Sequence, residues 1–253
     1  MVDGEAKIPV IPHKNSKSMA TKRKKLVVLT GAGISAESGL RTFRDMNGLW
    51  EEYNVEDVAS PDGWRRDPDL VLRFYNERRR QLKAAQPNQG HIGLAELEEH
   101  FDTVIITQNV DNLHERAGST SVIHLHGKLT EVRSTANPNL IYTVDGDVNL
   151  GDKCEMGSQL RPNIVWFGEA VPAMDIAIDI ASEADIFAVV GTSLNVYPAA
   201  SLYRYAPREA PIFLIDPNDD VTVSAMSNRV EYIHEKASTG VARMKELLME
   251  KYR

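Results

Sequence analysis

Short apolar runs alternate with segments of helical periodicity along most of the chain. The apolar runs are rich in β-branched residues and apolar at both odd and even positions, as expected for strands that are covered on both faces. They fall at residues 26–30, 103–107, 122–126, 186–191, 211–216 and 230–234. Helical periodicity marks residues 68–82, 88–101, 173–184 and 238–251. This alternation predicts an α/β fold with a doubly wound parallel sheet.

Two segments depart from the pattern. Residues 127–163 have no helical stripe and contain turn formers, so they predict a small, loop-rich insertion. Residues 1–24 are rich in Lys and Arg and poor in apolar residues near their end, which predicts a disordered basic leader. We therefore expect one catalytic domain over residues 25–253, with insertions at about 35–75 and 127–163.

Composition narrows the function classes. The net charge of −7 argues against a general nucleic-acid binder, which needs clustered basic residues. The single cysteine, Cys154, excludes an internal disulfide and fits a reducing compartment. No apolar run reaches the ~18 residues of a membrane span. We expect a cytoplasmic protein without a membrane partner; the sequence does not indicate the oligomeric state.

Polar and small residues follow the predicted strands. In a doubly wound sheet, ligands bind beyond the carboxyl ends of the strands. These residues are Gly31, Ala32, Gly33 and Ser35 after the first strand, Gln108, Asn109 and Asp111 after the second, His126 after the third, Gly191, Thr192 and Ser193 after the fourth, and Asp216 after the fifth. A glycine-rich turn before a helix is suited to pyrophosphate, and Asp216 to a ribose hydroxyl. Together they predict a dinucleotide site, although the Gly-Ala-Gly turn alone would also fit a purely structural turn.

Residues 41–50 (RTFRDMNGLW) form a long stretch without helical periodicity, seven residues after the glycine-rich turn at 31–33. Long loops in such places are often functional. We expect Phe43, Arg44 and Trp50 to contact the cofactor and to shield the nicotinamide ribose from water.

Five motifs carry a resemblance to a known family: GAGISAESGLRTFR, TQNVDNLHERAG, HLHG, RPNIVWFGE and GTSLNVYPAA. In order and spacing they are similar to the motifs of the sirtuin family, from about Leu26 to the C-terminus. The resemblance implies a Rossmann-like domain with a small inserted module. It also implies an NAD-dependent protein-lysine deacylase that releases nicotinamide and O-acyl-ADP-ribose, with acylated lysine side chains of proteins as its partners.

The resemblance assigns roles on the cofactor side. His126 matches the catalytic histidine, and an imidazole suits a general base because its pKa lies near neutral. Asn109 is expected to bind ribose hydroxyls or to order a water, Asp111 to hold the nicotinamide carboxamide, and Gln108 to hold the ribose. Residues 191–193 match the turn at the phosphates and the adenosine ribose.

Further roles are implied at the two ends of the site. Ala237 falls near the adenine contact of the family, and His124 is expected to be structural. The substrate peptide is expected to lie as an added strand along residues 165–169, in contact with Val165, Phe167, Gly168 and Glu169.

The predicted helix 68–82 contains two residues that bear on the acyl group. Tyr75 and Arg78 are three residues apart and share a face, which from spacing alone fits a solvated basic face. The segment FYNERR resembles the class III subgroup of sirtuins, desuccinylases and demalonylases, in which such a Tyr and Arg hold the acyl carboxylate. Thr42 also resembles that subgroup, whereas the bulk of Met46 would narrow the acyl pocket. We expect activity on acetyl- and succinyl-lysine.

The chain departs from the family at its metal site. The family usually carries two C-x-x-C pairs that bind a structural zinc, whereas this chain has Cys154 alone. We therefore expect no metal ligands. Three other functions compete with deacylation: NAD-dependent ADP-ribosyl transfer to protein, non-catalytic sensing of NAD, and NAD(P)-dependent oxidoreduction.

Overall fold

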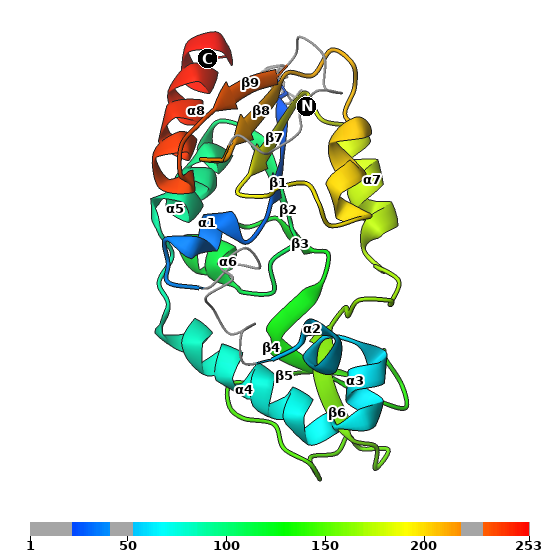
Figure 1. The fold of residues 1–253 in the computed structure, drawn as a ribbon. Coiled ribbons are helices and arrows are strands. Elements are labelled where there is room, and N and C mark those ends of the chain that lie inside the picture. Colours follow the sequence, from blue (N-terminus) through cyan, green and yellow to red (C-terminus); the bar gives the residue numbers. More distant parts are fainter. Residues whose placement is uncertain (1–21, 41–52, 219–229, 253) are drawn as a thin grey trace, which may run out of the picture.

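The computed structural model describes residues 22–40, 53–218 and 230–252, and it divides into a larger core and a smaller module (Figure 1). The core contains a parallel sheet with strand order β3-β2-β1-β7-β8-β9. Its strands are β1 (Lys25–Thr30), β2 (Asp102–Thr107), β3 (Val122–His124), β7 (Ile186–Val190), β8 (Ile212–Ile215) and β9 (Val230–Ile233). The predicted fold class is confirmed.

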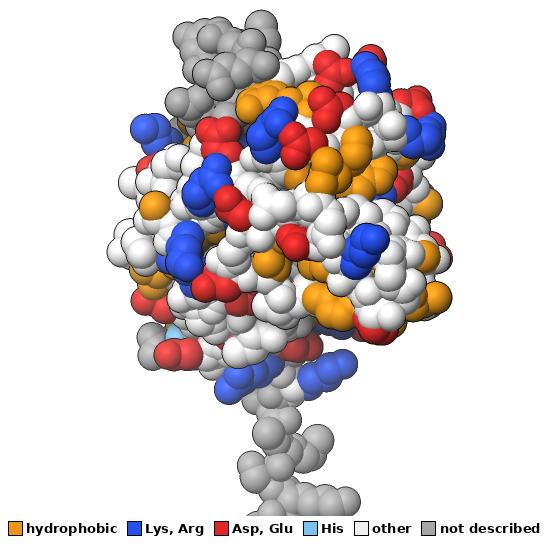
Figure 2. Space-filling model, turned by 90° about the horizontal axis from the view of Figure 1, so that it is seen from below, with side chains coloured by type: hydrophobic (Ala, Val, Ile, Leu, Met, Phe, Trp, Pro, Cys, Tyr) orange, Lys and Arg blue, Asp and Glu red, His pale blue; other side chains and the backbone are white. Residues whose placement is uncertain are grey.

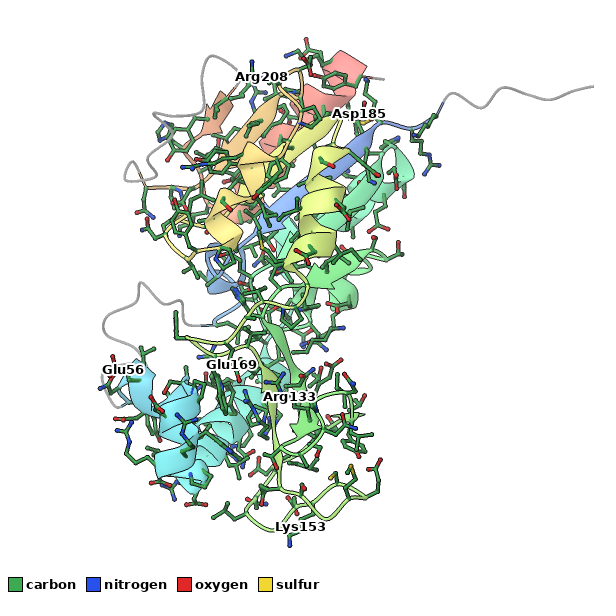
Figure 3. The ribbon with its side chains drawn as sticks, turned by 90° about the vertical axis from the view of Figure 1, so that its right-hand side faces the viewer. Glu56, Arg133, Lys153, Glu169, Asp185 and Arg208 are labelled. Atoms are coloured by element: carbon green, nitrogen blue, oxygen red, sulfur yellow. The ribbon has the colours of Figure 1, made fainter. Side chains whose placement is uncertain are left out.

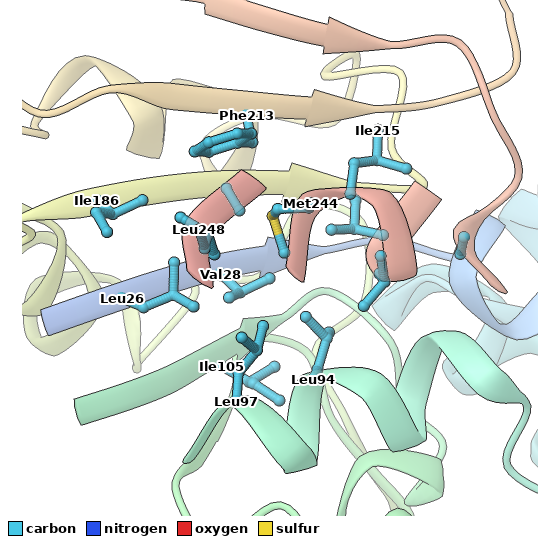
Figure 4. Packing of buried hydrophobic residues seen from close by; sticks show 14 of the residues in the cluster. Leu26, Val28, Leu94, Leu97, Ile105, Ile186, Phe213, Ile215, Met244 and Leu248 are labelled. Carbon is cyan, nitrogen blue, oxygen red and sulfur yellow. The ribbon is translucent and has the colours of Figure 1, made fainter. Parts of the chain in front are cut away.

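Helices cover both faces of this sheet because its strands are apolar on both. On one face lie α5 (Gln89–Glu96), the short 3₁₀ turn η1 (Leu97–Glu99) and α8 (Ala237–Tyr252). They pack on one set of alternating strand residues, such as Leu26 and Val28 (Figure 4). On the other face, α7 (Met174–Ser182) and the 3₁₀ helix η2 (Ala199–Arg204) pack on the intervening set, such as Val27 and Leu29.

The module combines three helices with a second sheet. This antiparallel sheet has the order β5-β4-β6 and comprises β4 (Gly127–Ser134), β5 (Ile141–Thr143) and β6 (Leu160–Ile164). Against it lie α2 (Val55–Val58), α3 (Pro61–Arg66) and α4 (Pro68–Ala84). Asp67 caps α4 by accepting the N–H of Leu70, and Pro68 fits the first helical position. The helix continues past residue 75, the predicted end of the first insertion.

The module's outer face is seen from below in Figure 2, where acidic and basic side chains are interspersed with smaller apolar groups. Within the described residues, no helix has the length and apolarity needed to cross a membrane. Residues 1–21 of the predicted leader lie outside the described part of the chain. So do Phe43, Arg44 and Trp50, together with Thr42 and Met46.

Candidate functional site

A cavity of about 660 Å³ lies between the core and the module, at the carboxyl ends of β1, β2, β7 and β8. This volume is in the range of cofactor and ligand sites. The cavity is lined by every predicted site residue that the structure describes. These are Gly31, Ala32, Gly33, Ser35, Tyr75, Arg78, Gln108, Asn109, Asp111, His126, Val165, Phe167, Gly168, Glu169, Gly191, Thr192, Ser193, Asp216 and Ala237.

Two glycine turns interlock on the core side of the cavity. The N–H of Gly33 donates to the carbonyl oxygen of Gly191 at 2.8 Å, which joins the turn after β1 to the turn after β7. A Cβ on Gly33 would lie 2.7 Å from that oxygen, and one on Gly191 would lie 2.4 Å from the Ile34 nitrogen. Gly191 also has a φ of +63°, which favours glycine. Short α1 (Gly33–Ala36) begins at this turn.

The loop after β2 is fixed by hydrogen bonds to these turns. Asn109 is buried, and its Nδ2 donates to the Gly31 carbonyl at 3.1 Å and to Ser35 Oγ at 3.2 Å. The side-chain amide nitrogen is used in this way, so the oxygen Oδ1 is the atom that Asn109 offers to a ligand. On the same loop, Gln108 Nε2 donates to Thr192 Oγ1 at 3.2 Å. Asn109 and Gln108 thereby tie β2, β1 and β7 together at the cavity floor.

Asp111 is buried beside Asn109 and holds two internal hydrogen bonds. Its Oδ2 accepts the hydroxyl of Ser35 at 2.9 Å, and its Oδ1 accepts the N–H of Leu113 at the start of α6 (Leu113–Ala117). Burial raises the pKa of Asp111, while these two bonds lower it. Behind Ser35 lies His91, whose pKa is lowered by burial to about 4, so that it is neutral at pH 7.

His126 follows β3 and faces the cavity. Its Nδ1 lies 2.9 Å from the carbonyl oxygen of Gln108. A carbonyl can only accept, so Nδ1 carries the proton and Nε2 is left as the basic nitrogen of the neutral ring. Burial lowers the pKa of His126 and outweighs the hydrogen bond to Gln108, which raises it. The geometry is therefore that of a general base.

Three residues of the module side lie together. Tyr75 and Arg78 both come from α4 and line the cavity, as expected from their spacing. Trp166 Nε1 donates to the Tyr75 hydroxyl oxygen at 3.0 Å. Burial raises the pKa of Tyr75 to about 12, so the phenol stays neutral and keeps its proton for a further acceptor.

Glu169 was predicted to bind the substrate, but the structure engages its carboxylate within the protein (Figure 3). Arg161 donates to both carboxylate oxygens, at 2.8 and 3.2 Å, and Arg133 approaches at 3.3 Å. The N–H of Trp166 donates to Glu169 Oε2 at 2.9 Å. The Arg161 guanidinium also lies 3.3 Å above the centroid of the Trp166 ring. The side chain of Glu169 thus fixes the turn on which Phe167 and Gly168 stand.

Trp166 and Glu37 are among the cavity residues that the sequence does not predict. Trp166 stands within the quoted motif RPNIVWFGE, but its bond to Tyr75 joins segments 91 residues apart and leaves no local signal. Glu37 lines the cavity and accepts both the N–H and the hydroxyl of Ser238, in the first turn of α8. An acidic residue is favoured at a helix N-terminus, but here it comes from a distant segment.

The donor set on the core side fits a dinucleotide. The small residues of the interlocked turns would let a phosphate approach the backbone, and Thr192 and Ser193 line the cavity beside these turns. Asp216 is buried at the end of β8, where its Oδ1 already accepts two hydrogen bonds from Asn218. Asn109 Oδ1 and His126 Nε2 offer acceptors to ribose hydroxyls.

The donor set of the module does not fit a structural zinc, which takes four nitrogen or sulfur ligands. Cys154 is the single cysteine of the chain, and no histidine occurs in residues 127–163. The thiol of Cys154 donates to Ser134 Oγ at 3.2 Å. The same oxygen accepts the N–H groups of Ala136 and Asn137, at 3.1 and 3.2 Å. Hydrogen bonds therefore hold this turn.

Comparisons with known proteins agree with this geometry. A family model described as the Sir2 family matches residues 31–198. The chain is 54% identical over 232 residues to an NAD-dependent protein deacylase of Bacteroides thetaiotaomicron, covering 89% of this chain and 98% of that protein. It is 55% identical over 214 residues to an NAD-dependent protein deacylase of Helicobacter pylori, covering 85% of this chain and 93% of that protein.

Solved structures give the same result. A Sir2 homolog–NAD complex is 41% identical, with a TM-score of 0.79, and the match covers 89% of this chain and 91% of that chain. A Sir2–p53 peptide–NAD+ complex is 34% identical, with a TM-score of 0.74, and the match covers 90% of this chain and 95% of that chain. The chain belongs to the Sir2 family.

Proposed function

We propose that this NAD-dependent protein deacylase removes acidic acyl groups, succinyl and malonyl, from lysine side chains, in addition to acetyl groups. The observation that carries the proposal is a guanidinium without a carboxylate partner at the module end of the cavity. Of the described residues, none forms an ion pair with Arg78, whereas its neighbours Arg73 and Arg80 on α4 pair with Asp69 and Asp147.

The surroundings of Arg78 suit an anionic ligand. Its side chain is partly buried, and its guanidinium lies 5.7 Å from the ring centroid of Phe74. Burial lowers the pKa of Arg78, but a guanidinium stays protonated in proteins. A partly desolvated cation in an apolar cleft binds a carboxylate more strongly than an exposed cation does.

Tyr75 supplies a second contact for the same carboxylate. Its hydroxyl oxygen accepts the N–H of Trp166 and its high pKa keeps the proton, so the hydroxyl donates into the cavity. A phenol and a guanidinium on one helix face could both donate to one carboxylate. An acetyl group would leave both donors without that partner.

On the core side, we assign the chemistry to a few residues. Bound NAD supplies the ribose carbon that receives the acyl oxygen as nicotinamide leaves. His126 would take a proton from a ribose hydroxyl through Nε2, because its Nδ1–H is held by Gln108. Asn109 would orient the ribose through Oδ1. The segment 165–169 would hold the peptide, since the N–H groups of Val165 and Phe167 donate to the carbonyl oxygens of His126 and Ala59 and fix its backbone.

The test compares the wild type with the Arg78→Met variant. Each is incubated with NAD and with acetyl-, succinyl- or malonyl-lysine peptides, and turnover is measured. We expect kcat/KM on the succinyl peptide to fall roughly ten- to a hundredfold. This corresponds to a loss of ~1.5–3 kcal/mol of transition-state binding, the size of a hydrogen bond to a charge. Acetyl turnover should change little. Arg73→Met is the matched control, because Arg73 lies on the same helix with its side chain exposed.

Two results would decide against the proposal. Equal losses on acetyl and succinyl peptides would show that Arg78 does not contact the acyl carboxylate. Nicotinamide release without loss of the acyl group, with label from NAD retained on protein, would indicate ADP-ribosyl transfer instead.

A further inference from the structure

The imidazole of His124 lies behind the loop that carries the cofactor-facing residues. His124 is the last residue of β3, and its side chain is only 6% exposed. Its Nδ1 lies 3.2 Å from the carbonyl oxygen of Asn109, and its Nε2 lies 2.9 Å from Glu115 Oε1. The ring thus bridges the loop after β2 and helix α6.

Both partners of the ring are acceptors. The Asn109 carbonyl has no proton to give. Burial by itself raises the pKa of Glu115, but the hydrogen bond and charge of His124, with Lys128, hold that pKa at about 2, so the carboxylate is ionised. A neutral imidazole has one N–H and would set a lone pair against one of these oxygens. Two acceptors therefore require two N–H groups, which is the imidazolium form.

Other groups facing the ring are consistent with a cation. Glu115 Oε2 is buried without a hydrogen-bond partner among the described residues, so that carboxylate depends on His124 and Lys128. The positive charge of His124 lowers the pKa of Asp111, against the larger effect of burial, which raises it. It also lowers the pKa of His114 on α6, which burial lowers most.

His124 and His126 act on consecutive peptide carbonyls. His126 Nδ1 holds the carbonyl of Gln108, and His124 Nδ1 holds that of Asn109. Residues two apart in an extended segment lie on one side of it, which explains how both rings reach the same loop. The loop is thus held by two imidazoles, one neutral and one charged.

We propose that His124 is a positioning residue for the reaction: as an imidazolium it donates to the Asn109 carbonyl and to Glu115, and so clamps the Asn109 peptide. The side chains of Asn109 and Asp111 are thereby set toward NAD. This inference rests on the NAD-dependent activity proposed for the cavity. It revises the structural role expected for His124 from the sequence.

The experiment measures NAD binding by calorimetry, without acyl substrate, from about pH 5 to about pH 9, which covers the range of about pH 5 to 8 in which histidines change charge. His124→Gln should weaken NAD binding about tenfold or more near neutral pH. His100→Gln, at an exposed histidine after η1, is the matched control and should bind NAD as the wild type does.

Glu115→Gln keeps the shape of the pair and removes the charge that favours the imidazolium. As the pH rises, the affinity of Glu115→Gln for NAD should decline at a lower pH than that of the wild type. In His124→Gln this decline should be absent. A side chain that only filled space would lower affinity equally at every pH. If His124→Gln does not fold, Glu115→Gln carries the test.

Three outcomes are distinct. A shifted decline in Glu115→Gln supports the clamp. Wild-type affinity in both variants across the pH range, with the wild type binding NAD, overturns it. Absence of NAD binding by the wild type would overturn the proposed function itself, and this inference with it.

Discussion

The core and the module are stabilised by different kinds of contact. In the core, β7 is buried from Ile186 to Val190, and helices pack on both faces of its sheet. In the module, the ends of β5 are exposed, and buried polar groups make many of the contacts. Asn76, for example, exchanges two hydrogen bonds with the backbone of Val148 and is 3% exposed. Apolar burial dominates the core, whereas the module combines smaller apolar clusters with buried polar pairs.

This difference is reflected in the site. The core contributes its floor, which comprises the backbone turns and His126, the proposed general base. The module contributes Tyr75 and Arg78, the side chains that we propose contact the acyl group. Changes to the floor should therefore affect all substrates alike, and changes to the module should separate them.

The largest expected effect is that of His126→Ala on the floor. Loss of a general base lowers kcat by ~10²–10⁴-fold, and we expect this loss on acetyl and succinyl peptides alike. Steady-state kinetics on both peptides would measure it, with unfolding curves as the control for folding. Burial lowers the pKa of His126, and the base acts in its neutral form. In the pH profile of the wild type, the rising limb of kcat/KM should therefore lie at a pH below ~6.5, the ordinary pKa of histidine. Wild-type turnover in the variant would assign the base to another group.

The next effect concerns the interlocked turns. Gly33→Ala places a Cβ 2.7 Å from the Gly191 carbonyl oxygen, so the two turns must separate. We expect the free energy of unfolding to fall by ~2–4 kcal/mol, as for other strained core changes, with weaker binding of NAD. Gly146→Ala is the control in the module, because its Cβ would meet nothing within 4 Å. Equal stability of the two variants in denaturant unfolding would contradict the interlock.

The smallest effect is expected at the turn where the family usually binds zinc. Ser134→Ala removes the acceptor for Cys154 and for two backbone N–H groups, so we expect a loss of ~1–2 kcal/mol in the free energy of unfolding. Ser182→Ala, at an exposed position of α7, should cost less than ~0.5 kcal/mol. A chelator should leave the wild-type Tm unchanged; a clear drop in Tm would show that a metal stabilises the module.

The sequence was sufficient for the core because strands covered on both faces leave unbroken apolar runs. The residues after those strands follow directly, since parallel strands end at one edge of the sheet. The module had no comparable signal. Residues 127–163 were expected to be loop-rich, yet they contain β4, β5 and most of β6, whose strands are only partly buried. Periodicity gives little warning of such strands.

The contacts around Glu169 could not be predicted from the local sequence pattern, for another reason. Its partner Arg133 is 36 residues away in sequence, and only the antiparallel register of β4 with β6 brings Arg133 opposite Arg161. The carboxylate of Glu169 therefore holds the segment 165–169 in shape. Side-chain roles of this kind follow from tertiary neighbours and not from residue type.

The pairing of β1 with β7 has a consequence for the order of synthesis. Strand β1 (Lys25–Thr30) lies between β2 and β7, and β7 begins only at Ile186. All the module's strands and helices precede β7 in the chain, so a ribosome completes them first. The turn after β1 can form its hydrogen bond to Gly191 only after β7 has emerged. Contacts between distant segments close slowly, so the floor for NAD is assembled late, on a module whose chain is already complete.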